Sequence, residues 1–83
     1  MTLRFVWSPS ARIELRRVDR DTAMRILIAL TRYGRTGEGD VKALEGQLTD
    51  TYRLRVGDWR VRFKRIEGGA IHILAVENRG QAY

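Results

Sequence analysis

The chain has 83 residues, 43% of them hydrophobic and 31% charged, which indicates one small soluble domain over residues 1–83. No apolar stretch is long enough to span a bilayer and the N-terminus lacks the zones of a secretory signal, so we expect a cytoplasmic protein. With no cysteine and a single histidine, neither a disulfide nor a zinc site is expected. The net charge of +6 is largely arginine, whose planar guanidinium grips phosphate, and it favours a polyanionic partner.

The first predicted elements are a strand and a helix. Alternation over residues 2–7 predicts an opening strand with Arg4 on the face opposite its large apolar residues. Ser8 and Pro9 predict a helix start, because serine caps a helix and proline suits its first position. We expect this helix to run to about Val18. Its apolar stripe is Ala11, Leu15 and Val18.

A second helix is predicted soon after the first. Either Asp21 or Thr22 is a suitable cap, and the helix is expected to continue to about Tyr33 with Gly34 as its stop. The residues predicted to face the core are Ala23, Ile26, Leu27, Leu30 and Tyr33. Two helices joined by so short a connection form a hairpin that packs on one face of a sheet.

Residues 34–50 are predicted to be an irregular connector, with Val41, Leu44 and Leu48 against the core. Three glycines in its first part resemble a phosphate-binding loop only superficially. No strand is predicted directly before them and no GK[ST] follows, so the connector reading is favoured.

The most informative stretch is the sequence YRLRVGDWRVRF at residues 52–63. Aromatic and branched apolar residues alternate with arginines on both sides of Gly57 and Asp58. This pattern predicts strands over 51–56 and 59–66 joined by a two-residue turn. The apolar set on one face is Tyr52, Leu54, Val56, Trp59, Val61 and Phe63.

Four arginines then share the other face of this hairpin. The predicted register sets Arg55 opposite Arg60 and Arg53 opposite Arg62. Like charges directly opposite each other destabilise a ladder, so a structural reason for this arrangement is lacking. We interpret the four guanidiniums as a binding surface for a polyanion.

A turn from Glu67 to Gly69 leads into the last predicted strand, Ala70 to Glu77. The order β-α-α-β-β-β predicts an α+β fold, in which a two-helix hairpin packs on one face of a small, mainly antiparallel four-stranded sheet. Strict alternation places His72 on the same face as Leu74 and Val76, where a structural role is favoured over catalysis. Glu77 could orient Arg79 or contact an antitoxin, but it is interpreted as a plain surface carboxylate.

The element order, the hairpin and the tail together resemble the RelE/ParE family of bacterial toxins from type II toxin–antitoxin modules. The motifs are L-x-G at residues 44–46, Y-R-x-R-x-G-x-x-R in the hairpin, and N-R-x-x-x-Y at residues 78–83. The resemblance covers nearly the whole chain and implies a RelE-like fold. It also implies a cognate antitoxin, and an acidic, partly disordered chain would suit a domain of charge +6.

The resemblance implies a choice of activities. The RelE branch enters the ribosomal A site and cuts mRNA there, by attack of a 2′-hydroxyl on the adjacent phosphate, whereas the ParE branch poisons DNA gyrase. A third alternative is an antitoxin-binding module that has lost catalysis. We expect a ribosome-dependent mRNA endoribonuclease, with ribosome and mRNA as partners and with no metal, cofactor or membrane involved.

The residues that match the family's working positions are Arg53, Arg55, Arg60, Arg79 and Tyr83. Arginines would balance charge on the phosphoryl oxygens, and Tyr83 would stack on a base or transfer a proton. RNA binding is also expected of Arg53, Arg62, Arg4 and Lys64. Some family members carry lysines at the first two hairpin positions, where this chain has arginines. Because arginine is a poor general base, the base remains open between Tyr83, the ribosome and catalysis by positioning alone.

Overall fold

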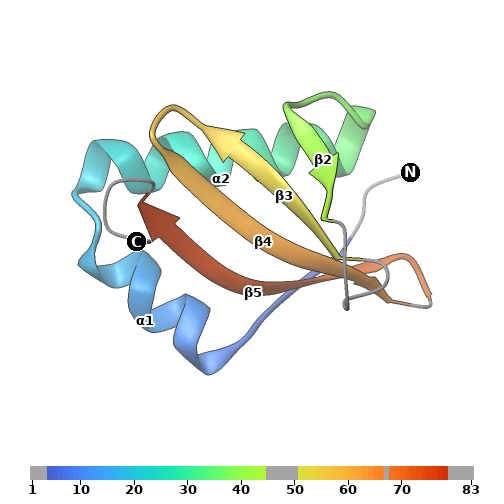
Figure 1. The fold of residues 1–83 in the computed structure, drawn as a ribbon, viewed down its shortest axis with the longest axis horizontal. Helices are drawn as coiled ribbons and strands as arrows, with labels where there is room; N and C mark the ends of the chain where they lie inside the picture. The colour runs from blue at the N-terminus through green and yellow to red at the C-terminus, as the bar shows by residue number, and fades with distance from the viewer. Residues whose placement is uncertain (1–3, 45–50, 67, 79–83) are drawn as a thin grey trace.

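The computed structural model describes residues 4–44, 51–66 and 68–78. The elements in chain order are β1 (Arg4–Trp7), α1 (Pro9–Arg17), α2 (Arg20–Thr36), β2 (Val41–Ala43), β3 (Thr51–Val56), β4 (Trp59–Ile66) and β5 (Ala70–Asn78). One sheet has the strand order β1-β5-β4-β3-β2, in which β1 is parallel to β5 and the other pairs are antiparallel. Both helices lie on one side of this sheet (Figure 1). The predicted α+β fold is confirmed, with one strand more than expected.

The additional strand, β2, lies within the predicted connector. Its Val41 pairs with Leu54 and its Ala43 with Tyr52, along the outer edge of β3. Three residues are too few for an alternating pattern to be recognised, and this strand forms because β3 offers an unpaired edge. The predicted core contact Leu48 lies outside the described residues.

Local signals set the start of α1 as predicted. The Ser8 hydroxyl oxygen accepts the Ala11 N–H at 3.1 Å, and Pro9 is the first helical residue. The helix ends at Arg17, with Val18 as its C-cap.

Both predicted ends of α2 were wrong. The N-cap is Asp19, whose carboxylate accepts the Thr22 N–H at 3.0 Å, so the helix begins earlier than expected. Gly34 is buried inside the helix, which continues to Thr36 and ends at Gly37 in the left-handed conformation at φ 78°. The stop signal therefore belongs to the second glycine, because Gly34 lies on the face that packs against the core.

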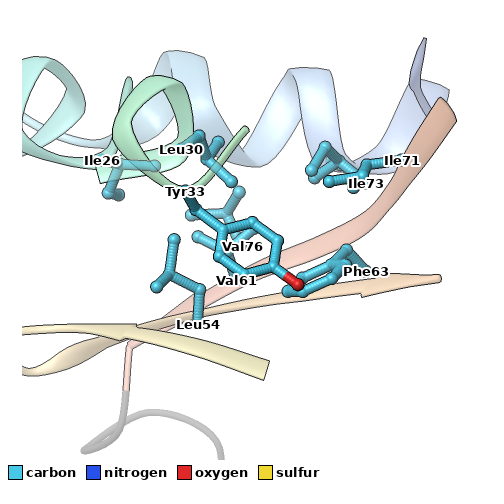
Figure 2. Close-up of a cluster of buried hydrophobic side chains, with 10 residues drawn as sticks. Ile26, Leu30, Tyr33, Leu54, Val61, Phe63, Ile71, Ile73 and Val76 are labelled. Carbon is cyan, nitrogen blue, oxygen red and sulfur yellow. The ribbon is translucent and has the colours of Figure 1, made fainter. Parts of the chain in front are cut away.

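The core lies between the helices and the sheet (Figure 2). From α2, Ile26, Leu30 and Tyr33 are buried, but the predicted core residue Leu27 is 37% exposed. The predicted inner face of the hairpin is confirmed, with Leu54, Val61 and Phe63 fully buried. The Phe63 ring packs 5.4 Å from the Tyr33 ring and 5.6 Å from the Tyr52 ring, measured between centroids.

Within the described ranges, no helix has the length and apolar character needed to cross a membrane.

Candidate nucleic-acid interface

The β3–β4 hairpin has the predicted register. Val56 pairs with Trp59 across a turn in which Gly57 adopts φ 60°. Consequently Arg55 lies opposite Arg60 and Arg53 lies opposite Arg62. We call the side of the sheet that carries these four arginines, away from the helices, the basic face.

Two lysines extend the basic face. Lys64 continues β4 beyond Arg62 and is exposed, and its role in RNA binding stays a prediction. Lys42 of β2 pairs with Arg53, which places a further cation in the same row. Sequence reasoning missed Lys42 because β2 was not predicted. Arg55 and both lysines are exposed, whereas Arg53, Arg60 and Arg62 are half-buried.

Glu77 enters this site from β5, which contradicts its interpretation as a plain surface carboxylate. Arg62 Nε donates to Glu77 Oε1 at 2.9 Å and Nη2 to Oε2 at 3.5 Å, a two-pronged ion pair. Glu77 also lies directly opposite Arg60 in the ladder. No local signal marked this partner, since Glu77 meets Arg62 only when β4 and β5 pair.

The ion pair distinguishes Arg62 from Arg53 and Arg55. The charge of Arg62 is balanced by Glu77, which itself is about 30% exposed at the side chain. The side chains of Arg53 and Arg55, by contrast, form no hydrogen bond or ion pair in the part of the chain that the structure describes. These two guanidiniums keep their donors available for a ligand, as bidentate phosphate recognition requires.

Arg4 does not join this cluster. It pairs with Ala70, while Arg60 pairs with Glu77 at the other end of β5. At about 3.3 Å per residue the separation is roughly 20 Å, so Arg4 cannot contact the same phosphate. That Arg4 binds RNA stays a prediction, and it would have to contact a nucleotide other than the one at the paired arginines.

The face assigned to His72 needs correction. β5 carries a bulge, because Arg62 pairs with Ala75 while the next residue, Phe63, pairs with Ile73. The bulge exchanges the two faces, so that Val76 is buried in the core whereas His72 lies opposite Lys64 on the basic face. On this face the row of His72 follows that of Arg53 and Arg62, about 7 Å further along β4, and it lies roughly 13 Å from the row of Arg55 and Arg60.

Arg79 and Tyr83, the tail residues of the predicted site, lie outside the described residues and stay predictions.

One arginine serves the fold instead of the basic face. Arg65 lies on the helix side of the sheet, where its guanidinium donates to the Tyr33 hydroxyl and stacks 4.6 Å from the centre of the Tyr52 ring. Cation–π contact of this kind stabilises an exposed site by about 0.5–1 kcal/mol. Arg65 is thus held by aromatic side chains rather than presented to a ligand on the basic face.

The arrangement suits an anionic ligand that has several phosphates. Glu77 is the one carboxylate that the ladder pairs of the described ranges set opposite any of the four arginines, and it is already paired. Asp40 lies next to Arg55, whose backbone N–H donates to the Asp40 carbonyl at 2.9 Å. Opposed guanidiniums repel each other until an anion lies between them, so phosphate binding would relieve the unfavourable pairing of Arg55 with Arg60. No group of three or more acidic or histidine side chains within these ranges is placed to hold a metal ion.

The solved structures to which this chain is similar include toxins and toxin–antitoxin complexes. The chain is similar to the toxin–antitoxin complex RelBE2 of Mycobacterium tuberculosis, with 20% identity, TM-score 0.82, and 95% of this chain and 100% of that chain covered. It is 30% identical to a chain of the archaeal RelE–RelB complex of Pyrococcus horikoshii OT3, with TM-score 0.72 and coverage of 99% and 100%. Toxin RelE of E. coli, solved as a mutant in the free state, matches at 18% identity and TM-score 0.77, with coverage of 99% and 87%.

A scan against protein-family models finds no match, and neither does a search of curated proteins by sequence. The fold and the basic face define a small α+β protein that carries paired arginines on the side of its sheet opposite a helical hairpin. The chain belongs to the RelE family of toxins, as its length-wide match at 30% identity shows.

Proposed function

We propose that this protein is the toxin of a type II toxin–antitoxin module and that it cuts mRNA on the ribosome. The observation that supports this activity most is the basic face, on which Arg55 opposes Arg60 and Arg53 opposes Arg62. Membership of the RelE family supports the toxin role, and similar structures named as RelB–RelE complexes support a cognate antitoxin.

The proposed reaction is a transesterification at one phosphate of the RNA, with the neighbouring 2′-hydroxyl as the nucleophile. The 2′-oxygen forms a bond to the adjacent phosphorus, the bond from phosphorus to the 5′-oxygen breaks, and a 2′,3′-cyclic phosphate and a 5′-hydroxyl result. The proton of the 2′-hydroxyl passes to a base, and the leaving 5′-oxygen takes up a proton. Charge grows on the phosphoryl oxygens during this step, and fixed cations stabilise it.

Arg55 and Arg60 are the residues we assign to that charge. They lie opposite each other in the second row from the turn, which is the first row on the basic face, within reach of one phosphate between them. Arg53 would bind a neighbouring phosphate, and Lys42 and Lys64 would extend the track along the RNA. Neither arginine acts as the base, so the ribosome or Tyr83 would accept the proton, and Arg79 would add charge at the reacting phosphate.

The antitoxin would find a second, chemically different surface on the helices. Met24, Leu27 and Ile28 on the outer side of α2 are 49%, 37% and 61% exposed, and they line a shallow hollow that also contains Arg32 and Arg35. A second copy of this chain would bring arginines against arginines there. An acidic amphipathic helix would instead bury the apolar stripe and pair with the arginines at its border, and the +6 net charge supports such a partner.

The activity is tested by translation of a defined message with purified ribosomes and this protein, followed by mapping of the new RNA ends. We expect cuts only when ribosomes are present. The cuts should lie within the coding sequence and leave 2′,3′-cyclic phosphate ends. Growth arrest with intact mRNA would refute the proposal. Gyrase-linked DNA breaks in the same cells would then favour the ParE-type activity, and inert expression would favour an antitoxin-binding module without catalysis.

A further inference from the structure

The bulge in β5 decides which side chains reach the basic face. Leu74 is the additional residue, because Ala75 pairs with Arg62 while Ile73 pairs with the next residue of β4. In a regular strand, Glu77 would share the helix side with Ile73, and Val76 would lie on the basic face. With the bulge, Val76 is buried at 3% exposure and Glu77 binds Arg62.

The bulge begins where β5 loses its second neighbour. The last pair with β1 joins Trp7 to Ile73, so the residues after it have no strand partner on that side. Ser8 fills the first gap, because its N–H donates to the Ile73 carbonyl at 3.0 Å and its hydroxyl donates to the Leu74 carbonyl at 3.1 Å. The same residue caps α1 and therefore ties the helix start to the bulge.

Glu14 of α1 fills the second gap. Its Oε1 accepts the Val76 N–H at 2.9 Å in a partly buried setting. Glu14 follows the buried Ala11 by three residues and so faces the sheet, a place where α1 would ordinarily present an apolar side chain. An acceptor is needed there, since a backbone N–H without a partner is costly away from water. Sequence reasoning saw only the apolar stripe of α1 and overlooked Glu14.

We propose that Glu14 is a positioning residue for the basic face. By accepting the Val76 N–H it holds the bulged form of β5, and this form presents Glu77 to Arg62. Glu77 then withholds Arg62 from the RNA, whereas the side chains of Arg53 and Arg55 form no hydrogen bond or ion pair within the described residues and keep their donors for phosphate. The inference rests on the proposed function in one respect, that the basic face binds RNA phosphates.

The test measures how the affinity for a single-stranded oligoribonucleotide depends on salt, with 2′-deoxy sugars throughout its central positions to prevent cleavage. Each additional phosphate contact steepens the slope of log K against log [salt] by about 0.7 for single strands. Glu77→Gln should steepen the slope by about that amount because it removes the carboxylate that balances the charge of Arg62. Glu14→Ala should do the same, and Glu14→Ala combined with Glu77→Gln should be no steeper than Glu77→Gln alone.

Glu14→Gln is the matched control. It removes the same charge as Glu14→Ala but keeps an amide oxygen that can accept the Val76 N–H. We expect the wild-type slope for this variant, together with the wild-type NMR signal of the Arg62 Nε–H. A steepened slope for Glu14→Gln would mean that Glu14 acts by charge alone and would overturn the proposal. An unchanged slope for Glu14→Ala, or a further increase in the double variant, would overturn it as well.

Two further measurements cover the remaining outcomes. If Glu14→Ala does not fold, hydrogen exchange of the Val76 amide is measured in the wild type and in Glu14→Gln. Protection in both proteins supports the hydrogen bond from Val76 to residue 14, and rapid exchange in the wild type refutes it. If the protein binds the oligonucleotide but never cuts mRNA, the proposed function fails while the slopes still test Glu14. If it does not bind RNA at all, the Arg62 Nε–H signal of Glu14→Ala still reports whether Glu77 has been released.

Discussion

Replacement of Arg55 by glutamine should weaken RNA binding while it stabilises the free protein. Arg55 is exposed, lies opposite Arg60, and its side chain forms no hydrogen bond or ion pair within the described residues. A hydrogen bond between a charged donor and phosphate contributes about 1.5–3 kcal/mol, and the exposure of Arg55 places it near the lower value. A loss of about 1.5 kcal/mol corresponds to roughly tenfold weaker binding.

The same substitution removes one pair of opposed like charges. Such pairs are destabilising, and opposing side chains across a ladder contribute about 0.2–1 kcal/mol, so the free energy of unfolding should rise within that range. Opposite signs for stability and binding distinguish a functional arginine from one that supports the fold. Urea unfolding at low ionic strength measures the first quantity, and fluorescence anisotropy with a labelled, non-cleavable oligoribonucleotide measures the second.

Arg25→Gln is the control with the same change in net charge. Arg25 is exposed on α2, which packs against the other side of the sheet. We expect Arg55→Gln to make the salt slope shallower by about 0.7 and Arg25→Gln to leave it almost unchanged. Equal losses for the two variants would show that net charge alone attracts the RNA, and the reasoning from the basic face would be refuted.

Three other substitutions test separate parts of the molecule. Hydrogen bonds from the Thr22 side chain, and next from the Thr22 backbone N–H, hold the pKa of Asp19 below its ordinary value of 3.8. The contribution of Asp19 to stability is therefore complete above that pH, and it is lost as the pH falls through the lowered pKa. Asp19→Ala should therefore lower stability at pH 7 and flatten the acid side of the stability profile, as thermal unfolding between pH 2 and 7 would show; an unchanged profile would contradict the cap. Gly57→Ala should lower the free energy of unfolding in urea by about 1–2 kcal/mol, because φ is 60° at residue 57 and this conformation is unfavourable for alanine. An added Cβ meets nothing within 4 Å, so a much larger loss would mean that the turn has another constraint. Ile28→Asp should weaken antitoxin binding at least tenfold in calorimetry, since burial of an isoleucine contributes about 1.5–3 kcal/mol. Ile66→Asp, at an exposed isoleucine of β4, should not weaken it, and equal effects would argue against the α2 surface.

Predictions from sequence succeeded where the deciding interactions are local. The β3–β4 hairpin has the expected ends and register, because a two-residue turn at Gly57 and the alternation on both sides leave one pairing that buries the apolar set. The start of α1 at Ser8 and Pro9 was equally readable, since the capping bond spans only three residues. From this hairpin alone, two opposed pairs of arginines followed.

Helix ends were harder to predict, even though their signals are also local. Asp19 and Asp21 are both suitable N-caps, and Gly34 and Gly37 are both suitable C-terminal stops. The choice within each pair depends on which residues the core requires to be helical. Gly34 lies on the buried side of α2, so the helix continues past it until Gly37. The core thus decided between two signals of similar strength.

What the sequence by itself determined is the hairpin, its arginine pairs and the class of fold, because alternation and turn chemistry act over a few residues. What only the tertiary structure decided is how the arginines differ from one another. The bulge at Leu74 forms because Ser8 and Glu14 offer hydrogen-bond partners at the edge of β5, and no pattern within β5 announces it. That long-range contact turns Glu77 toward Arg62 and thereby distinguishes Arg62 from Arg53 and Arg55.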